Sequence, residues 1–128
     1  MLEIIYNVIL LLVSQASQPI IVNYLESITY PAVARDAQIQ GTVEIDVSVS
    51  SRGDVISASA NSGNPVLKRA AEENIRRWRF APGDQRAFSI VYEFSLEEPR
   101  TPYRSETKNY YELPSRVRVV TNLPAGSH

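Results

Sequence analysis

A chain of 128 residues with 44% hydrophobic side chains is large enough for one domain with a modest core, but hardly for two. Its formal net charge of −1 provides no field that would attract nucleic acid, and the absence of cysteine excludes disulfides and thiolate chemistry. The only histidine is the last residue, His128, so we expect no Ser-His-Asp arrangement, no histidine-based metal site, no enzyme activity and no cofactor.

The first residues are typical of a secretory signal. Residues 4–13 are apolar apart from Asn7, and Ser14-Gln15-Ala16 has the small-x-small pattern of a cleavage site. A basic N-terminal region is missing and Glu3 is acidic, so an ordinary buried strand or helix is the alternative. Ten residues of helix span only ~15 Å, about half of the ~30 Å hydrocarbon core of a bilayer. We therefore predict a signal peptide over 1–16, no integral membrane span, and an exported protein that is soluble or peripherally membrane-associated.

A short N-terminal segment (17–27) precedes a short helix and a β-hairpin. Residues 30–37 indicate the helix, with Pro31 in its first turn and Gly41 beyond its end. Residues 42–49 alternate strictly between apolar and polar, and residues 54–61 alternate again after a turn over 50–54, which predicts an antiparallel hairpin. The inward face of this hairpin is expected to hold Val43, Ile45, Val47, Val49, Ile56, Ala58 and Ala60.

The segment from Asn64 predicts an amphipathic helix. Asn64 is a suitable N-cap and Pro65 suits the first helical position. Acid-before-base pairs four residues apart, 72 with 76 and 73 with 77, support the helix, which is expected to end before Pro82. The stripe that faces the core is predicted to be Leu67, Ala70, Ala71, Asn74, Ile75 and Trp78.

A third strand and a tail follow this helix. Between Phe88 and Leu96 the aromatic and aliphatic residues share one face, while residues 97–109 are polar and rich in charge. The interleaved valines and arginines of 116–121 suggest one more strand, which Pro114 would confine to an edge or a strand start. We predict an α+β two-layer sandwich over 28–97, with a mainly antiparallel three-stranded sheet and helices on one face, followed by a polar linker and strand-like tail over 98–128.

An ordered series of motifs gives residues 28 to 96 a family resemblance. The segment resembles the C-terminal domain of the TonB family, periplasmic proteins that deliver inner-membrane energy to outer-membrane transporters, and the resemblance implies a TonB/TolA C-terminal-like fold. The motifs that carry it are Tyr30-Pro31, Ala34-Arg35, Gly41, Val43, Gly53, Val55, Ser62-Gly63-Asn64-Pro65, Leu67, Ala70-Ala71 and Trp78-Arg79-Phe80-Ala81-Pro82.

The resemblance implies a function in protein recognition. TonB-like domains accept an extended segment of an outer-membrane transporter along the edge made by the last strand of the sheet, which here corresponds to Phe88–Leu96. Main-chain hydrogen bonds would supply affinity, and side chains on alternate faces would supply selectivity. An ordinary wet strand face and an ordinary basic helix end are the alternatives for these positions. The predicted partner-binding residues are Ser89, Val91, Glu93 and Ser95 on the strand, with Arg76, Arg77 and Arg79 as nearby steering groups.

Departures from the family keep other functions open. The long transmembrane helix and proline-rich spacer of energy transducers are not seen, so we expect a stand-alone binding module rather than a transducer. In a rival hypothesis the tail strand around 116–121 pairs with the sheet edge of its own chain or of a twin, which makes a self-capped domain or a homodimer. Glu44 and Asp46 share a strand face but make a poor cation site, and they argue against nucleic acid on that face.

Overall fold

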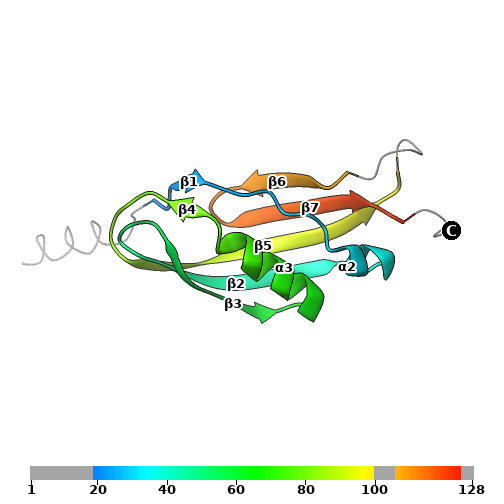
Figure 1. The fold of residues 1–128 in the computed structure, drawn as a ribbon, viewed down its shortest axis with the longest axis horizontal. Helices are drawn as coiled ribbons and strands as arrows, with labels where there is room; N and C mark the ends of the chain where they lie inside the picture. Colours follow the sequence, from blue (N-terminus) through cyan, green and yellow to red (C-terminus); the bar gives the residue numbers. More distant parts are fainter. Residues whose placement is uncertain (1–18, 100–105, 125–128) are drawn as a thin grey trace, which may run out of the picture.

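The computed structural model describes residues 19–99 and 106–124, which form a five-stranded sheet with helices on one face (Figure 1). The sheet has the order β3-β2-β5-β7-β6, and β1 and β4 form a separate two-stranded sheet. The predicted α+β architecture is confirmed, but the main sheet has five strands where the sequence predicts three and one extra. The elements are β1 (Val22–Tyr24), α2 (Ala32–Asp36), β2 (Gly41–Val49), β3 (Val55–Ser62), α3 (Pro65–Ile75), β4 (Arg79–Phe80), β5 (Arg86–Glu97), β6 (Lys108–Glu112) and β7 (Arg116–Asn122).

The hairpin of β2 and β3 forms as its alternating pattern predicts, with one exception. The predicted inward valines and isoleucine of β2 are all buried, and Ala58 of β3 is buried against them. Ile56 was expected inside but is 56% exposed. The pairing register shifts between Ser48 and Val49 of β2, so Ile56 is an extra residue of β3 between two paired ones. Its side chain therefore does not follow the alternation that would point it to the core.

Helix α3 begins as predicted and ends earlier than predicted. The Asn64 side chain accepts a hydrogen bond of 2.9 Å from the Val66 N–H, which caps the first turn. The helix stops at Ile75, seven positions before Pro82, because the chain turns into β4. Phe80 of β4 donates its N–H to the Gly53 carbonyl at 2.8 Å, in the turn between β2 and β3.

Gly53 makes this close approach of two backbones possible. Its φ of +94° lies in the region that favours glycine, and an added Cβ would lie 1.9 Å from the Phe80 carbonyl oxygen. The turn between β2 and β3 and the chain after α3 are therefore locked together. Trp78, directly before β4, is fully buried by this arrangement even though it lies outside the helix.

The tail is part of the sheet, which corrects the prediction of an open edge along β5. β7 pairs in parallel with β5 from Val91 to Glu97, so this part of β5 is central. β6 pairs antiparallel with β7 on its other side, so β7 is not an edge strand and begins after Pro114, the other position expected for it. Pro114 lies in the turn between β6 and β7, after a cis peptide bond from Leu113. Two valines of β7, Val117 and Val119, are fully buried in the core. Their burial explains why the tail forms a strand of the sheet instead of continuing as a polar linker.

Within residues 19–99 and 106–124, neither helix has the length and apolar character needed to cross a membrane. The predicted signal peptide, residues 1–16, lies outside the described residues.

Candidate interaction site at the sheet edges

Two of the predicted partner-binding residues, Ser89 and Val91, lie where the ladder between β5 and β7 begins: Val91 is its first residue, and Ser89 belongs to the preceding stretch of β5, which is paired with β2 alone. Ser89 is exposed on the face that the helices leave open, and its hydroxyl donates to a carboxylate oxygen of Asp46 at 2.9 Å. Val91 donates its N–H to the Ser115 carbonyl at 2.9 Å, at the start of the β5–β7 ladder. The N–H of Val91, which was expected to bond to an added segment, is therefore bonded to the tail of the same chain.

Glu93 and Ser95 continue this row on the open face of β5. Glu93 forms an ion pair of 3.3 Å with Arg116 of β7, and both side chains are partly exposed. Ser95 is half-buried and lies opposite Val120. Val91, Glu93 and Ser95 lie on a part of β5 that has β2 on one side and β7 on the other, so they do not line an edge.

The three predicted steering arginines lie in the helix layer, away from this row. Arg77 is paired with Glu26 at 3.4 Å, and Arg79 is paired with Asp54 at 3.4 Å. Both pairs are largely exposed, so they contribute little to stability. Arg76 follows the last residue of α3 and points to β3. The sequence groups the arginines with β5, but the fold separates the two sets on opposite faces of the sheet.

The edge at β3 is capped by side chains of α3. Glu72 accepts a hydrogen bond of 2.8 Å from the Ala60 N–H, and Arg76 donates to the Ala58 carbonyl at 2.9 Å. The Ala60 N–H and the Ala58 carbonyl point away from β2, toward the side on which an added strand would have to pair. The predicted pairing of Glu72 with Arg76 is replaced by these two bonds to β3, which are charge-assisted and satisfy backbone groups that the edge would otherwise leave unpaired.

The alternation of the ladder determines which groups of β7 face β6. Because the Ser115 carbonyl bonds to Val91 of β5, the backbone groups of every second residue of β7 face β5. The remaining residues, Arg116, Arg118 and Val120, therefore turn their N–H and C=O groups to β6. They lie opposite the first, third and fifth residues of that strand.

The outer edge of β6 carries backbone groups that have no partner in the described chain. Lys108, Tyr110 and Glu112 bond to β7, so the N–H and C=O groups of Asn109 and Tyr111 point away from the sheet. Among residues 19–99 and 106–124, no hydrogen bond to these outward groups is formed. An edge of this kind is a ready template for another strand.

A groove runs along β6 on the helix side of the sheet. The segment that joins β1 to α2 passes beside β6 (Figure 1), and the groove between them has a volume of ≈ 700 Å³. Asn109 holds this segment in place, because its side-chain amide accepts from the Ile28 N–H at 2.8 Å and donates to the Ile28 carbonyl at 3.0 Å. The groove is lined by Tyr24, Leu25, Glu26, Ser27, Ile28, Thr29, Thr107, Asn109 and Tyr111.

A buried amide, Asn74, fixes the other side of the same segment. Its side-chain nitrogen donates to the carbonyls of Glu26 and Ser27 at 2.9 and 3.2 Å. Its side-chain oxygen accepts from the Trp78 indole N–H at 3.1 Å and from the Tyr92 hydroxyl at 2.7 Å. Burial raises the pKa of Tyr92 well above its usual value, which keeps this hydroxyl a donor. The sequence placed Asn74 in the apolar stripe of α3, and a lone amide in such a stripe was the signal for this role.

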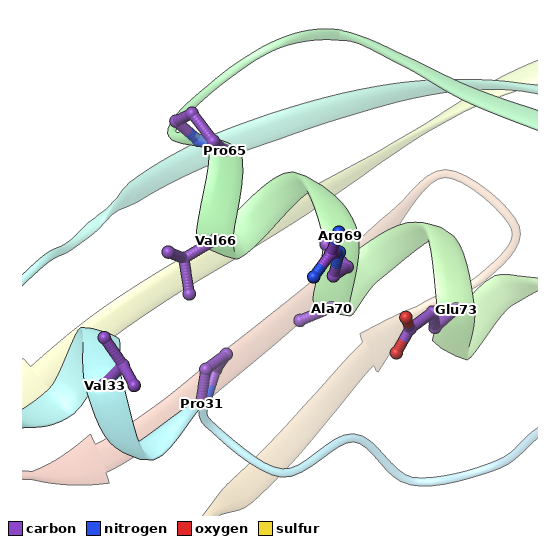
Figure 2. Close-up of a pocket in the computed structure, with 7 residues that line it drawn as sticks. All are labelled: Pro31, Val33, Pro65, Val66, Arg69, Ala70 and Glu73. Carbon is purple, nitrogen blue, oxygen red and sulfur yellow. The ribbon is translucent and has the colours of Figure 1, made fainter.

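A second hollow lies between the two helices and is unrelated to the edges. Figure 2 shows it between the start of α2 and the first turns of α3, with Val33 and Val66 facing each other. It has a volume of ≈ 670 Å³ and is mostly apolar, with Arg69 and Glu73 at its border. It includes none of the residues predicted to bind a partner.

No metal centre is formed in the described residues. No group of three or more histidine, cysteine, aspartate or glutamate side chains in 19–99 and 106–124 is placed to hold a metal ion. Asp46 instead bonds to Ser89 and, at 3.2 Å, to the side chain of Asn61. The acidic face of β2 is thus part of a polar row on the open sheet face.

Comparison with known proteins places this chain in a family. The family model for the Gram-negative bacterial TonB protein C-terminal matches residues 26–96. The protein TonB of Vibrio cholerae serotype O1 (strain ATCC 39315 / El Tor Inaba N16961) is 32% identical over 74 residues, which are 52% of this chain and 30% of that protein. The chain thus spans less than a third of this relative's length, and the family match ends before β6 and β7.

Proposed function

Because the chain belongs to the TonB C-terminal family, we propose that it is a periplasmic protein-binding module that pairs an extended segment of an envelope or outer-membrane transport protein with an edge of its sheet. The observation that supports this proposal best is the row of outward N–H and C=O groups on Asn109 and Tyr111 of β6. The proposed reaction is recognition alone, with no bond made or broken.

The position of the segment follows from what covers each strand. A segment that bound to β5 between Val91 and Glu97 would have to displace β7, and burying one valine side chain contributes about 1.5–3 kcal/mol. Val117 and Val119 are both fully buried, so this exchange would cost several such contributions at once. A segment that bound to β3 would have to displace Glu72 and Arg76 from its backbone. Addition to β6 displaces nothing in the described chain.

Selectivity would come from the two sides of the added strand. Side chains that point to the helix layer would enter the groove beside β6, next to Asn109 and Tyr111. Those on the other side would lie along the open face, next to the exposed ring of Tyr110 and the charged side chains of Lys108 and Glu112. The site would therefore favour a segment with alternating character, because successive side chains of a strand point to opposite faces.

A second candidate function is structural. In this alternative, β7 serves only to cap β5, and the domain is a self-capped module without a segment-binding role. The continuous pairing of β7 with β5 from Val91 to Glu97 favours it. The two proposals differ at β6, which must bind a segment in the first and has no ligand in the second.

Titration with peptides that tile the periplasmic segments of outer-membrane transport proteins distinguishes the two. We expect a peptide to slow the exchange of the Asn109 and Tyr111 amide protons, while the Val117 and Val119 amides stay protected. Tyr111→Pro removes one outward N–H and should abolish binding, whereas Tyr111→Ala loses the same ring, keeps the N–H and should bind. Equal binding by both variants, or loss of protection in β7 on binding, would contradict the proposed edge.

A further inference from the structure

A shallow hollow of ≈ 360 Å³ lies on the open face of the sheet and includes no residue of β6 or β7. It lies where the sheet is three strands wide, because β7 pairs with β5 only from Val91 onward. Two rows of side chains across these strands line it, namely Ser57, Ser48 and Ala87 in one row and Ser59, Asp46 and Ser89 in the other. We infer that this hollow binds the ammonium group of a lysine side chain from a partner protein, with Asp46 as the counter-ion.

The hollow exists because the side chains around Asp46 are small. In neighbouring strands, residues that lie directly opposite each other project from the same face of the sheet. Ser48 therefore stands between Ser57 and Ala87, and Asp46 stands between two serines. None of these neighbours is larger than a serine, and Asp46 itself is exposed, so its carboxylate can be reached from solvent.

The Asp46 carboxylate is held in position without being neutralised. One of its oxygens accepts a hydrogen bond of 2.9 Å from the Ser89 hydroxyl, and the other accepts one of 3.2 Å from the Asn61 side-chain amide. An ionised carboxylate has about four acceptor positions, so about two remain for a ligand. Three further acceptors in the hollow, which form no hydrogen bond within residues 19–99 and 106–124, are the hydroxyls of Ser48, Ser57 and Ser59.

The charge beside the hollow is negative and uncompensated. Glu44 projects from the same face of β2 as Asp46, two residues earlier in the strand. Within residues 19–99 and 106–124, the ion pairs involve other acids, so neither Glu44 nor Asp46 is paired with a cation there. Two neighbouring carboxylates without a counter-ion attract a positive charge, so charge complementarity selects a cationic ligand.

The arrangement of the acceptors favours an ammonium over other cations. An ammonium is compact and has three donors that point in different directions, which suits a single carboxylate among hydroxyls. A guanidinium pairs two parallel donors with both oxygens of a carboxylate, and here these oxygens already accept from Ser89 and Asn61. A metal ion requires more charged ligands, and no group of three or more acidic side chains in the described residues is placed to hold one.

The surroundings of the hollow indicate that the ammonium belongs to a protein. One exposed ion pair contributes little, so a free amine would bind more weakly than a partner that also contacts the surface around the hollow. Ile56, which precedes Ser57 in β3, is 56% exposed, and a protein that covers the hollow can also cover this side chain. The long stem of a lysine can reach Asp46 from the side on which this part of β5 has no further strand.

Titration of the full chain with the peptide acetyl-Gly-Ser-Lys-Ser-Gly-amide at low salt, followed by nuclear magnetic resonance, tests the inference. Between about 0.1 and about 20 mM peptide, we expect the amide signals of Asp46, Ser59 and Ser89 to shift, while those of Asn109 and Tyr111 stay in place. The same peptide with Nε-acetyl-lysine has lost its charge and should cause no shift. The peptide with arginine in place of lysine should bind more weakly.

Two variants of equal charge separate the site from the overall field of the protein. Asp46→Asn keeps the size of the side chain and should weaken binding about fivefold or more. Glu73→Gln removes the same charge from an exposed position on α3 and should bind like the wild type.

Equal binding of the lysine and acetyl-lysine peptides, or equal weakening by the two variants, would overturn the inference. Shifts at Asn109 and Tyr111 without shifts around Asp46 would also overturn it, because the peptide then binds at the β6 edge. Binding of free ethylamine as tight as that of the lysine peptide would overturn the assignment to a protein partner. The proposed function is read at Asn109 and Tyr111, so each proposal can fail alone.

Discussion

At one edge of the sheet, the side chains of Glu72 in α3 and of Arg76 just after it bond to two outward groups of β3, whereas at the other edge the outward groups of β6 have no partner in the described chain. Both edges have the same chemical problem, which is a row of unpaired backbone donors and acceptors. In the described residues, charged side chains bond to outward backbone groups at the β3 edge and not at the β6 edge. The open edge beside a groove is therefore the place where we propose that a segment binds.

Side chains from α3 and its C-terminal end contact both the β3 edge and the segment beside β6. Glu72 and Arg76 reach β3, while Asn74 between them bonds to the segment that forms the far wall of the β6 groove. The edge at β3 and the groove at β6 are thus set by side chains from two successive turns of α3. The predictions below change one side at a time.

The largest contrast should come from proline placed on a central strand and on the open edge. Val91→Pro removes the N–H that bonds to Ser115, so we expect it to lower the free energy of unfolding by about 3 kcal/mol beyond the effect of Val91→Ala. Tyr111→Pro removes an outward N–H and should differ from Tyr111→Ala by less than about 1 kcal/mol. Urea unfolding of the four variants measures both differences. Similar penalties at the two positions would mean that Tyr111 is not on an open edge.

Removing the buried amide should have the next largest effect. Asn74→Ala leaves the donors of Trp78 and Tyr92 without their acceptor and releases the carbonyls of Glu26 and Ser27, so we expect a loss of about 2–3 kcal/mol. Thermal unfolding measures this loss. Asn61→Ala, which breaks one exposed bond, is the control and should stay within about 0.5 kcal/mol of wild type. The β6 groove should become more dynamic in Asn74→Ala, with faster exchange around residues 26–28 and unchanged exchange in β3.

Opening the capped edge should have a smaller effect on stability. Glu72→Ala removes the acceptor of the Ala60 N–H, which water can then reach, so we expect a loss of about 1 kcal/mol. Glu73→Ala, one residue along on the exposed side of α3, is the matched control and should be near neutral. Chemical denaturation provides the values. Equal values for the two variants would show that the cap on β3 contributes nothing.

The sequence predicts most of the elements whose signals are local. The alternation of β2, the N-cap and proline of α3, and the aromatic face of β5 each lie within one segment, and all three elements form as expected. The errors occur where a contact with a segment far along the chain determines the structure. α3 ends at Ile75 because β4 must reach β1 and Gly53, and neither contact has a signal in the helix itself.

The candidate site shows the same limit more strongly. Residues 110–121 contain a tyrosine pair, a proline and alternating valines, which indicate strands but not their neighbours or direction. The parallel pairing of β7 with β5 joins segments that are far apart in the sequence, so the strand expected to form the open edge, Phe88–Leu96, is covered by β7 from Val91 onward. The contacts of Glu72 and Arg76 show the same limit. Their four-residue spacing suggests an ion pair on the helix but does not indicate that the backbone of β3 lies beside them.

Amide hydrogen exchange on the dilute, uncomplexed chain tests the central claim most directly, because it reads the two edges in one sample. The account predicts that the Asn109 and Tyr111 amides exchange almost as fast as an unstructured chain. The Ala60 amide on the opposite edge should be slowed by its bond to Glu72, and the Tyr110 amide by its bond to β7. Strong protection of Asn109 and Tyr111 in the dilute chain, or an Ala60 amide that exchanges as fast as theirs, would contradict it.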